Sequence, residues 1–301
     1  MRGPMVALAG AMLLLMGLAA RAQAQDFSKV EIMTTDLGGR MYMLEGQGGN
    51  ITVAVADDGI MLVDTEFEPL HDKIKAAIAK LSSAPVRYAI DTHFHLDHSG
   101  GNAGFARDGA IVVAHESVKA HLVAGAAAGA TTPATPAVSG AALPARIYRS
   151  TLTLRLKGLH ANLAHAANAH TDGDTYVWFP DRNVLATGDI VSFGRYPNID
   201  YQHGGTIHGM IAATDRLLAL VNARTRIVPG HGPPGDKAAL AAYRAMLVAA
   251  RDRMAQLVQA GKSEEEAVAA RPFADYDAKF AVSDPLRIRF VRVMYHAVKG
   301  G

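Results

Sequence analysis

Histidine and aspartate are concentrated in one short run of this chain, at spacings that suit metal binding. The run DTHFHLDHSGGN holds four candidate ligands: His93, His95, Asp97 and His98. Imidazoles two residues apart in extended backbone project to the same side, which suits two ligands of one ion. Asp97 and His98 follow where the chain turns, so they can face a second ion a few ångströms away. We therefore predict a metal site here, the alternative being a solvated histidine-rich loop.

Three further candidate ligands follow at widening intervals, each at the end of a strand-like segment: His170, Asp189 and His231. His170 competes with the nearby His160 and His165, and its context HTDGD favours it. Asp189 could instead cap the segment that follows it. His231 lies between two glycines, which allows close backbone approach but also occurs in plain turns.

The types of these residues favour zinc. Imidazole mixed with carboxylate suits Zn²⁺ better than Ca²⁺ or Mg²⁺, which prefer all-oxygen ligands. The seven candidates are too many for one tetrahedral ion and about right for two Zn²⁺ per chain. Two such ions that hold water generate hydroxide near neutral pH, so the pattern predicts a hydrolase. The chain has no cysteine, so no thiolate can ligate zinc or attack a substrate.

The order H-x-H-x-D-H, followed by a distant His, Asp and His, resembles the metallo-β-lactamase superfamily over residues 30–235. Asp64 in MLVDT matches the early structural aspartate of that family. The resemblance implies an α/β fold, an αββα sandwich of two mixed β-sheets flanked by helices. The metals would lie at one edge, between the sheets.

The resemblance also implies how the ligands divide. Asp189 and a hydroxide would bridge the two ions, and Asp97 would be the catalytic residue that orients the hydroxide and hands on a proton. Two sets of three would complete the site: His93, His95 and His170 for one zinc, and Asp97, His98 and His231 for the other.

Asp189 bears on the subgroup within this family. Zinc β-lactamases proper usually lack an aspartate at this motif, whereas glyoxalase II-like and lactonase-like members have one. β-Lactam ring hydrolysis, with a role in antibiotic resistance, is still our first specific prediction, because an exported enzyme would meet β-lactams. Lactonase, thioesterase and phosphoesterase activities are alternatives. So are a di-iron redox relative, for whose partner domain the chain has no room, and a non-catalytic zinc protein, which would need only four ligands.

Candidate substrate residues carry weaker signals. Arg195 could bind a substrate carboxylate through its planar guanidinium, although an exposed structural role is the simpler interpretation. His203 and His208 could line the pocket, or be ordinary loop histidines. Asp172 and Asp174 could orient ligating imidazoles by hydrogen bonds from outside the ligand set.

The first 24 residues have the pattern of a cleavable signal peptide. Arg2 precedes the apolar stretch from Val6 to Ala20, and Ala22-Gln23-Ala24 fits a cleavage site. We expect a periplasmic or secreted protein, the alternative being an uncleaved N-terminal anchor. Without the leader, 28 basic residues face 28 acidic ones and no basic block remains, so a small-molecule substrate is expected and nucleic acid is not.

Strands and helices alternate in a way that can position these ligands. Residues 25–235 should form one hydrolase domain, and residues 236–301 a helical extension packed on it. The order of strand-rich and helical parts favours two sheets flanked by helices. Strands are expected at Met41–Leu44, Ile51–Ala56, Ile60–Val63, Val86–Ile90, Ile111–Ala114, Leu152–Leu156, Ala161–Ala164, Thr175–Phe179, Val184–Ala186 and Arg226–Val228. Helices are expected at Leu70–Leu81, from Glu116, at Ile207–Val221 and after Asp236, with a capping box at Ser263 and Glu266.

The segment from Gly125 to Pro144 has no periodicity and consists almost entirely of alanine, glycine, threonine, proline and serine. Such a composition fits a mobile loop or lid over the site, and it equally fits a slack surface insertion.

Overall fold

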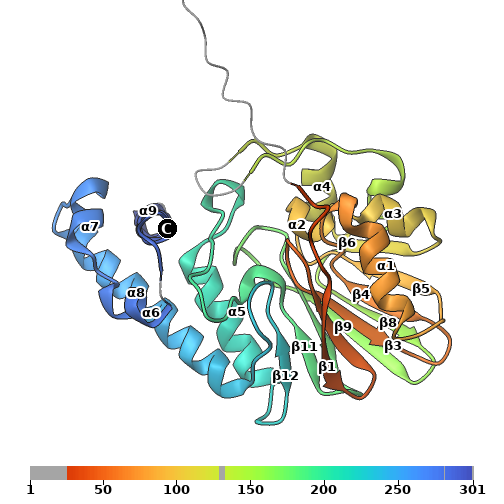
Figure 1. The fold of residues 1–301 in the computed structure, drawn as a ribbon. Coiled ribbons are helices and arrows are strands. Elements are labelled where there is room, and N and C mark those ends of the chain that lie inside the picture. Colours follow the sequence, from red (N-terminus) through yellow and green to blue (C-terminus); the bar gives the residue numbers. More distant parts are fainter. Residues whose placement is uncertain (1–25, 129–132, 281, 300–301) are drawn as a thin grey trace, which may run out of the picture.

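The computed structural model describes residues 26–128, 133–280 and 282–299. Two β-sheets pack face to face, and helices cover their outer faces (Figure 1). The predicted αββα sandwich of two mixed sheets is therefore confirmed. The expected signal peptide at residues 1–24 lies outside the described residues. No helix in the described part of the chain combines the length and apolar character needed to cross a membrane.

The first sheet has seven strands, which neighbour one another in chain order. The chain pairs antiparallel from β1 to β4 and parallel from β4 to β7. The strands are β1 (Met33–Gly38), β2 (Met41–Glu45), β3 (Ile51–Val55), β4 (Ile60–Val63), β5 (Val86–Ile90), β6 (Ile111–His115) and β7 (Arg146–Tyr148).

The second sheet has five strands in the order β12-β11-β10-β9-β8. Only β11 and β12 pair parallel; the other neighbours are antiparallel. Their bounds are β8 (Thr151–Leu156), β9 (Leu159–His165), β10 (Thr175–Phe179), β11 (Val184–Ala186) and β12 (Arg226–Val228).

Alternation along β4 shows how the layers are held together. Met61 and Val63 belong to the apolar cluster between the sheets, which also contains Val177 of β10. Ile60 and Leu62 point the other way, into the cluster under α1. Since side chains on a strand alternate between its two faces, a strand covered on both sides is apolar throughout. All four residues of β4 are accordingly buried.

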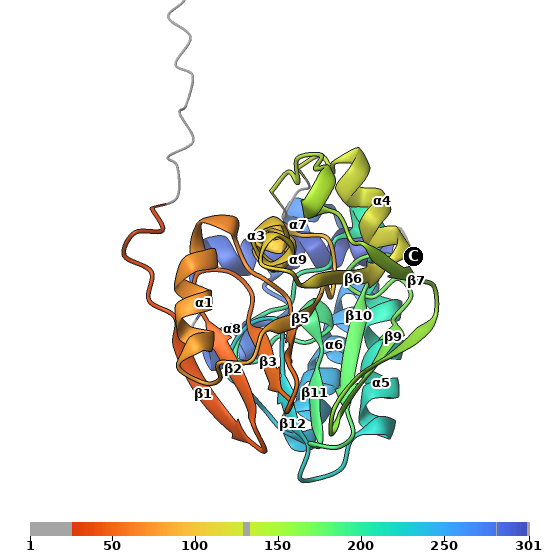
Figure 2. The ribbon, with the colours of Figure 1, turned by 90° about the vertical axis from the view of Figure 1, so that its right-hand side faces the viewer.

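The helices fall into two groups on opposite sides of the sandwich (Figure 1). In both views α3 and α4 lie at its upper end, with α9 level with them (Figure 2). The first group is α1 (His71–Ala79), α2 (Leu96–Ser99), α3 (Asn102–Arg107) and α4 (Glu116–Ala124). The second is α5 (Ile207–Leu220), α6 (Lys237–Gln259), α7 (Glu264–Ala270), α8 (Ala274–Phe280) and α9 (Asp284–Lys299).

The helices after residue 236 share one apolar cluster with α5 and the second sheet. Met210 of α5, Leu247 of α6 and Val293 of α9 are all buried in it. The predicted capping box is present: the Ser263 side chain accepts from the backbone N–H of Glu266, and Glu266 accepts from that of Ser263.

The predicted strands and helices are confirmed with ends shifted by one or two residues. The helix expected at Leu70–Leu81 is α1 (His71–Ala79), and a 3-10 turn (Glu68–Leu70) precedes it. Two strands were missed. β1 is a mostly exposed edge strand with polar residues, and β7 has only three residues, so neither carries a clear apolar alternation.

Candidate metal centre

The seven predicted ligands meet at one edge of the sandwich. They come from loops and short helices that follow strands of both sheets, so the two-sheet packing is what brings them together. The origins are as follows: His93 and His95 after β5, Asp97 and His98 in α2, His170 between β9 and β10, Asp189 in a 3-10 turn after β11, and His231 after β12.

Three overlapping groups of these side chains have ligand atoms within 4.8 Å of one another. The His95 Nδ1 and His170 Nε2 atoms are 3.0 Å apart. On the other side, the Nε2 atoms of His98 and His231 are 3.4 Å apart. The groups are His93 with His95 and His170, His93 with His98 and Asp189, and Asp97 with His98 and His231.

The Asp189 carboxylate lies between the two histidine sets. Its Oδ1 is 3.3 Å from His98 Nε2 and 3.4 Å from His231 Nε2. Its Oδ2 is 3.6 Å from His170 Nε2. One oxygen of this carboxylate therefore faces each histidine set.

Hydrogen bonds outside the cluster fix which nitrogen each imidazole turns inward. His98 Nδ1 donates to Asp64 Oδ2 at 2.7 Å, and His170 Nδ1 donates to the Asn198 carbonyl at 3.0 Å. In His95 the two ring nitrogens exchange these roles: Nε2 donates to Asp200 at 2.9 Å, and Nδ1 faces the cluster. Such partners set the tautomer that leaves the inner nitrogen free to coordinate.

Two buried atoms of the cluster have no hydrogen-bond partner among the described residues, which fits a metal site. His93 Nδ1 lies 3.0 Å from the Thr92 hydroxyl, while its Nε2 points inward. That Nε2 and Asp189 Oδ1 are buried atoms without a hydrogen-bond partner among the described residues. Buried polar atoms are rarely left unsatisfied, and coordination would satisfy both.

Neighbouring charges and burial shift the pKa values of the residues in the cluster. Burial acts to raise the pKa of Asp97, but the charge of His98 and a hydrogen bond from His231 lower it to about 2. Burial acts to lower the pKa of His231, but Asp189 raises it to about 9. Burial, followed by the like charge of His98, lowers the pKa of His93 well below its usual value. Without metal the carboxylates therefore hold protons on nearby imidazoles, and cations would replace those protons.

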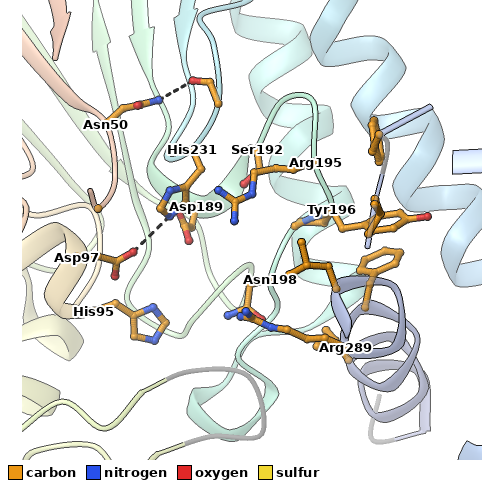
Figure 3. Close-up of a pocket in the computed structure, with 18 of the residues that line it drawn as sticks. Asn50, His95, Asp97, Asp189, Ser192, Arg195, Tyr196, Asn198, His231 and Arg289 are labelled. Carbon is orange, nitrogen blue, oxygen red and sulfur yellow. Dashed lines mark hydrogen bonds and ion pairs between the residues drawn. The ribbon is translucent and has the colours of Figure 1, made fainter. Parts of the chain in front are cut away.

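Glycines give the backbone room to close around the ligands. A Cβ at Gly230 would collide with the Asp189 carboxylate, and a Cβ at Gly49 would collide with the His98 ring. Asn50 holds the turn around His231 by donating to the carbonyls of Pro229 and Gly232 at 2.9 and 2.8 Å (Figure 3).

The other candidates from the sequence have other places. Asp174 accepts from the His170 backbone N–H at 2.5 Å, so it supports that ligand as expected. Asp172 lies 2.9 Å from His121 instead. His160 pairs with Asp181, and His165 stacks on His115 with ring centroids 3.8 Å apart. Neither His160 nor His165 belongs to a ligand group.

Asp200 is a residue that the sequence analysis missed. One of its oxygens lies 2.9 Å from His95 Nε2 and 2.7 Å from His203 Nδ1. His203 therefore contacts the site through Asp200, and neither it nor His208 lines the main pocket. No spacing in the sequence could reveal Asp200, because 105 residues separate it from His95.

A pocket of about 940 Å³ opens above the ligand cluster (Figure 3). Asp97, Asp189 and His231 line one side, and the loop with Arg195 and Tyr196 lines another. The far side comes from α8, α9 and their connection. Pro133 also lines the pocket, so the segment 125–144 borders the site, although residues 129–132 lie outside the described part.

Comparisons with known proteins also indicate the metallo-beta-lactamase family. A model described as the metallo-beta-lactamase superfamily matches residues 44–232. The chain is 32% identical over 203 residues to 2,4-dinitroanisole O-demethylase subunit alpha of Nocardioides sp. (strain JS1661), an alignment that covers 66% of this chain and 57% of that protein.

Two solved structures illustrate the likeness in fold. A metallo-beta-lactamase from Pontibacter korlensis matches with a TM-score of 0.60 and 19% identity, over 72% of this chain and 99% of its own. A stereoselective inverting sec-alkylsulfatase from Pseudomonas sp. matches with a TM-score of 0.67 and 18% identity, over 88% of this chain and 50% of its own.

Proposed function

Because the chain belongs to the metallo-beta-lactamase superfamily of hydrolases, we propose that it holds two zinc ions and hydrolyses an amide or ester bond. The observation that carries this proposal is the position of Asp189. Its Oδ1 lies 3.4 Å from His231 Nε2 and its Oδ2 lies 3.6 Å from His170 Nε2, so one carboxylate lies between the two histidine sets.

The residues that would hold the ions follow from the inward-facing atoms. Asp189 would serve both sites. The first would use His93 Nε2, His95 Nδ1 and His170 Nε2, and the second would use Asp97, His98 Nε2 and His231 Nε2.

When bound, the zinc ions would polarise the scissile carbonyl and supply hydroxide near neutral pH. The chain's own groups set up the rest of the reaction. Asp97 lines the pocket, with its Oδ2 3.4 Å from His231 Nε2. Its carboxylate can orient the attacking water and accept a proton from it, and can later pass that proton to the leaving group.

A β-lactam ring is the first specific substrate that we propose. The family and the expected export of the protein support it. Asp189 supports the alternatives, which are lactonase, thioesterase and phosphoesterase activity. The alkylsulfatase fold match adds sulfate esters to that set, and the O-demethylase relative adds aryl methyl ethers. A di-iron redox enzyme stays a distinct hypothesis because histidine and carboxylate also bind iron.

The test combines metal content with turnover. The purified enzyme should contain about two zinc ions per chain and hydrolyse a chromogenic cephalosporin or one member of an ester, thioester, phosphoester and sulfate ester panel. Chelation should abolish turnover and zinc should restore it. A folded, active sample without zinc would contradict the proposal, and bound iron with colour would favour the redox hypothesis.

We also propose that the protein is exported, on the basis of the sequence pattern in residues 1–24. Periplasmic extracts should contain the mature chain with Gln25 as its first residue. An intact N-terminus on a membrane-bound product would favour the anchor alternative.

A further inference from the structure

Two arginines from distant parts of the chain line the pocket above the metal ligands. Arg195 lies on the loop after Asp189, and Arg289 lies on α9. In Figure 3 both side chains extend from the side opposite Asp97 and His95 into the space between. Both remain accessible to solvent, so a ligand in the pocket could reach them.

Direct packing fixes the two backbones that carry these arginines. Tyr196, next to Arg195, stacks on Phe290, next to Arg289, with ring centroids 3.9 Å apart and an interplanar angle of 8°. The Tyr196 hydroxyl also donates to Asp277 Oδ1 at 2.7 Å. Burial, followed by the hydrogen bond to Asp277, raises the pKa of Tyr196. The Tyr196 hydroxyl therefore stays neutral and keeps donating to Asp277.

The charges around the pair favour an anion between them. Partial burial and then the like charge of Arg195 lower the pKa of Arg289, while the carboxylates of Asp189 and Asp97 act in the opposite direction. Metal ions would engage those two carboxylates and weaken their effect on the arginines. Among the described residues, Arg195 takes part in no hydrogen bond or ion pair. Two neighbouring cations repel each other, and an anion that touches both would relieve that repulsion.

We propose that Arg195 and Arg289 form a two-guanidinium subsite that binds an oxyanion of the substrate, a carboxylate or a sulfate, beside the metal centre. The planar fork of arginine matches both groups through paired hydrogen bonds. Leu286 and Val293 of α9 line the same pocket and offer apolar contact to the rest of the molecule. The substrate class is thus an anionic molecule with an apolar body. The assignment of a substrate class rests on the proposed hydrolase function.

The kinetic test uses a matched pair of esters. Mono-4-nitrophenyl adipate carries a carboxylate where 4-nitrophenyl hexanoate carries a methyl group. Arg195→Met and Arg289→Met should each raise KM for the adipate about ten-fold or more, which corresponds to about 1.4 kcal/mol, and leave KM for the hexanoate and kcat for both unchanged. Arg289→Lys should restore only part of the adipate binding, because the fork is lost.

The control removes the same charge from the same helix. Arg292 lies on α9, pairs with Glu264 at 2.9 Å and does not line the main pocket. Arg292→Met should therefore leave both KM values unchanged. If Arg289→Met does not fold, as judged by circular dichroism, Arg289→Gln and Arg195→Met carry the test.

A binding measurement separates this inference from the proposed function. Calorimetry on the zinc-loaded enzyme compares hexanoate, hexyl sulfate and neutral hexanamide. Anion binding that weakens about ten-fold in each arginine variant supports the subsite even if no ester is hydrolysed, and in that case only the hydrolase proposal fails. Equal anion binding in the wild type and both variants overturns the subsite even if esters are hydrolysed. The tighter of the two anions identifies the oxyanion.

Discussion

The two sides of the pocket are built differently. On the metal side, five of the seven predicted ligands are buried, Asp97 and His231 are half-buried, and further hydrogen bonds to Asp64 and Asp200 fix the imidazoles. On the helix side, Arg195 and Arg289 are exposed, and a stack of two rings fixes their backbones rather than the guanidiniums themselves.

This difference suggests a division of labour. Bond cleavage needs ligands at fixed positions, since small displacements of reacting groups are costly. Selection among substrates needs side chains that a substrate entering from solvent can contact. Changes on the metal side should therefore lower turnover of every substrate alike, whereas changes on the helix side should alter preference among substrates.

The largest effect is expected for Asp189→Ala. Loss of the shared carboxylate should lower zinc content below two per chain and reduce kcat/KM about 100-fold or more for all substrates. Metal analysis and steady-state kinetics on the same sample check this. Asp181→Ala, at an exposed pair with His160, is the matched control and should behave as wild type. Full activity in Asp189→Ala would remove the basis for a shared carboxylate.

Asp200→Asn should have the next largest effect, because it weakens the contact that orients His95. We expect a loss of about 10- to 100-fold in zinc affinity or activity, again for all substrates alike. Competition with a zinc-binding dye gives the affinity. A change confined to anionic substrates would contradict the division between the two sides.

The metal-free protein should lose stability as the pH rises. The pKa of His231 is raised from 6.5 to about 9 in the fold, so its contribution is fully present below pH 6.5 and is lost on approaching pH 9. Denaturation of the chelated protein should show a decrease of roughly 1–3 kcal/mol across that window. His231→Gln should flatten the profile, and a wild-type profile already flat there would refute this account of the charges.

The smallest effect is expected for Tyr196→Phe. It removes the hydrogen bond to Asp277 but keeps the stack on Phe290. We expect a destabilisation of about 1–3 kcal/mol and only a several-fold rise in KM for an anionic ester. Thermal denaturation and kinetics on the matched esters measure both. An equal rise in KM for the neutral ester would show that the contacts of Tyr196 shape the whole pocket rather than the arginine subsite.

The same contrast explains what the sequence could predict. The ligands on the metal side carry local signals, since H-x-H-x-D-H and the glycines beside His231 appear as short patterns. Asp64 was also recognised, from MLVDT. Asp200 and Arg289 carry no such signal, because only the packing of loops and α9 brings them to the pocket. Strands β1 and β7 were missed for a related reason: pairing with a neighbour, rather than their own apolar pattern, makes them strands.

A crystal structure of the zinc-loaded protein, with anomalous data at the zinc edge, would test the proposed two-metal centre most directly. We expect two peaks about 3.5–4 Å apart, one on each side of the Asp189 carboxylate. His170 should contact one ion and His231 the other. A single peak, or two peaks without Asp189 between them, would contradict the proposed two-metal centre.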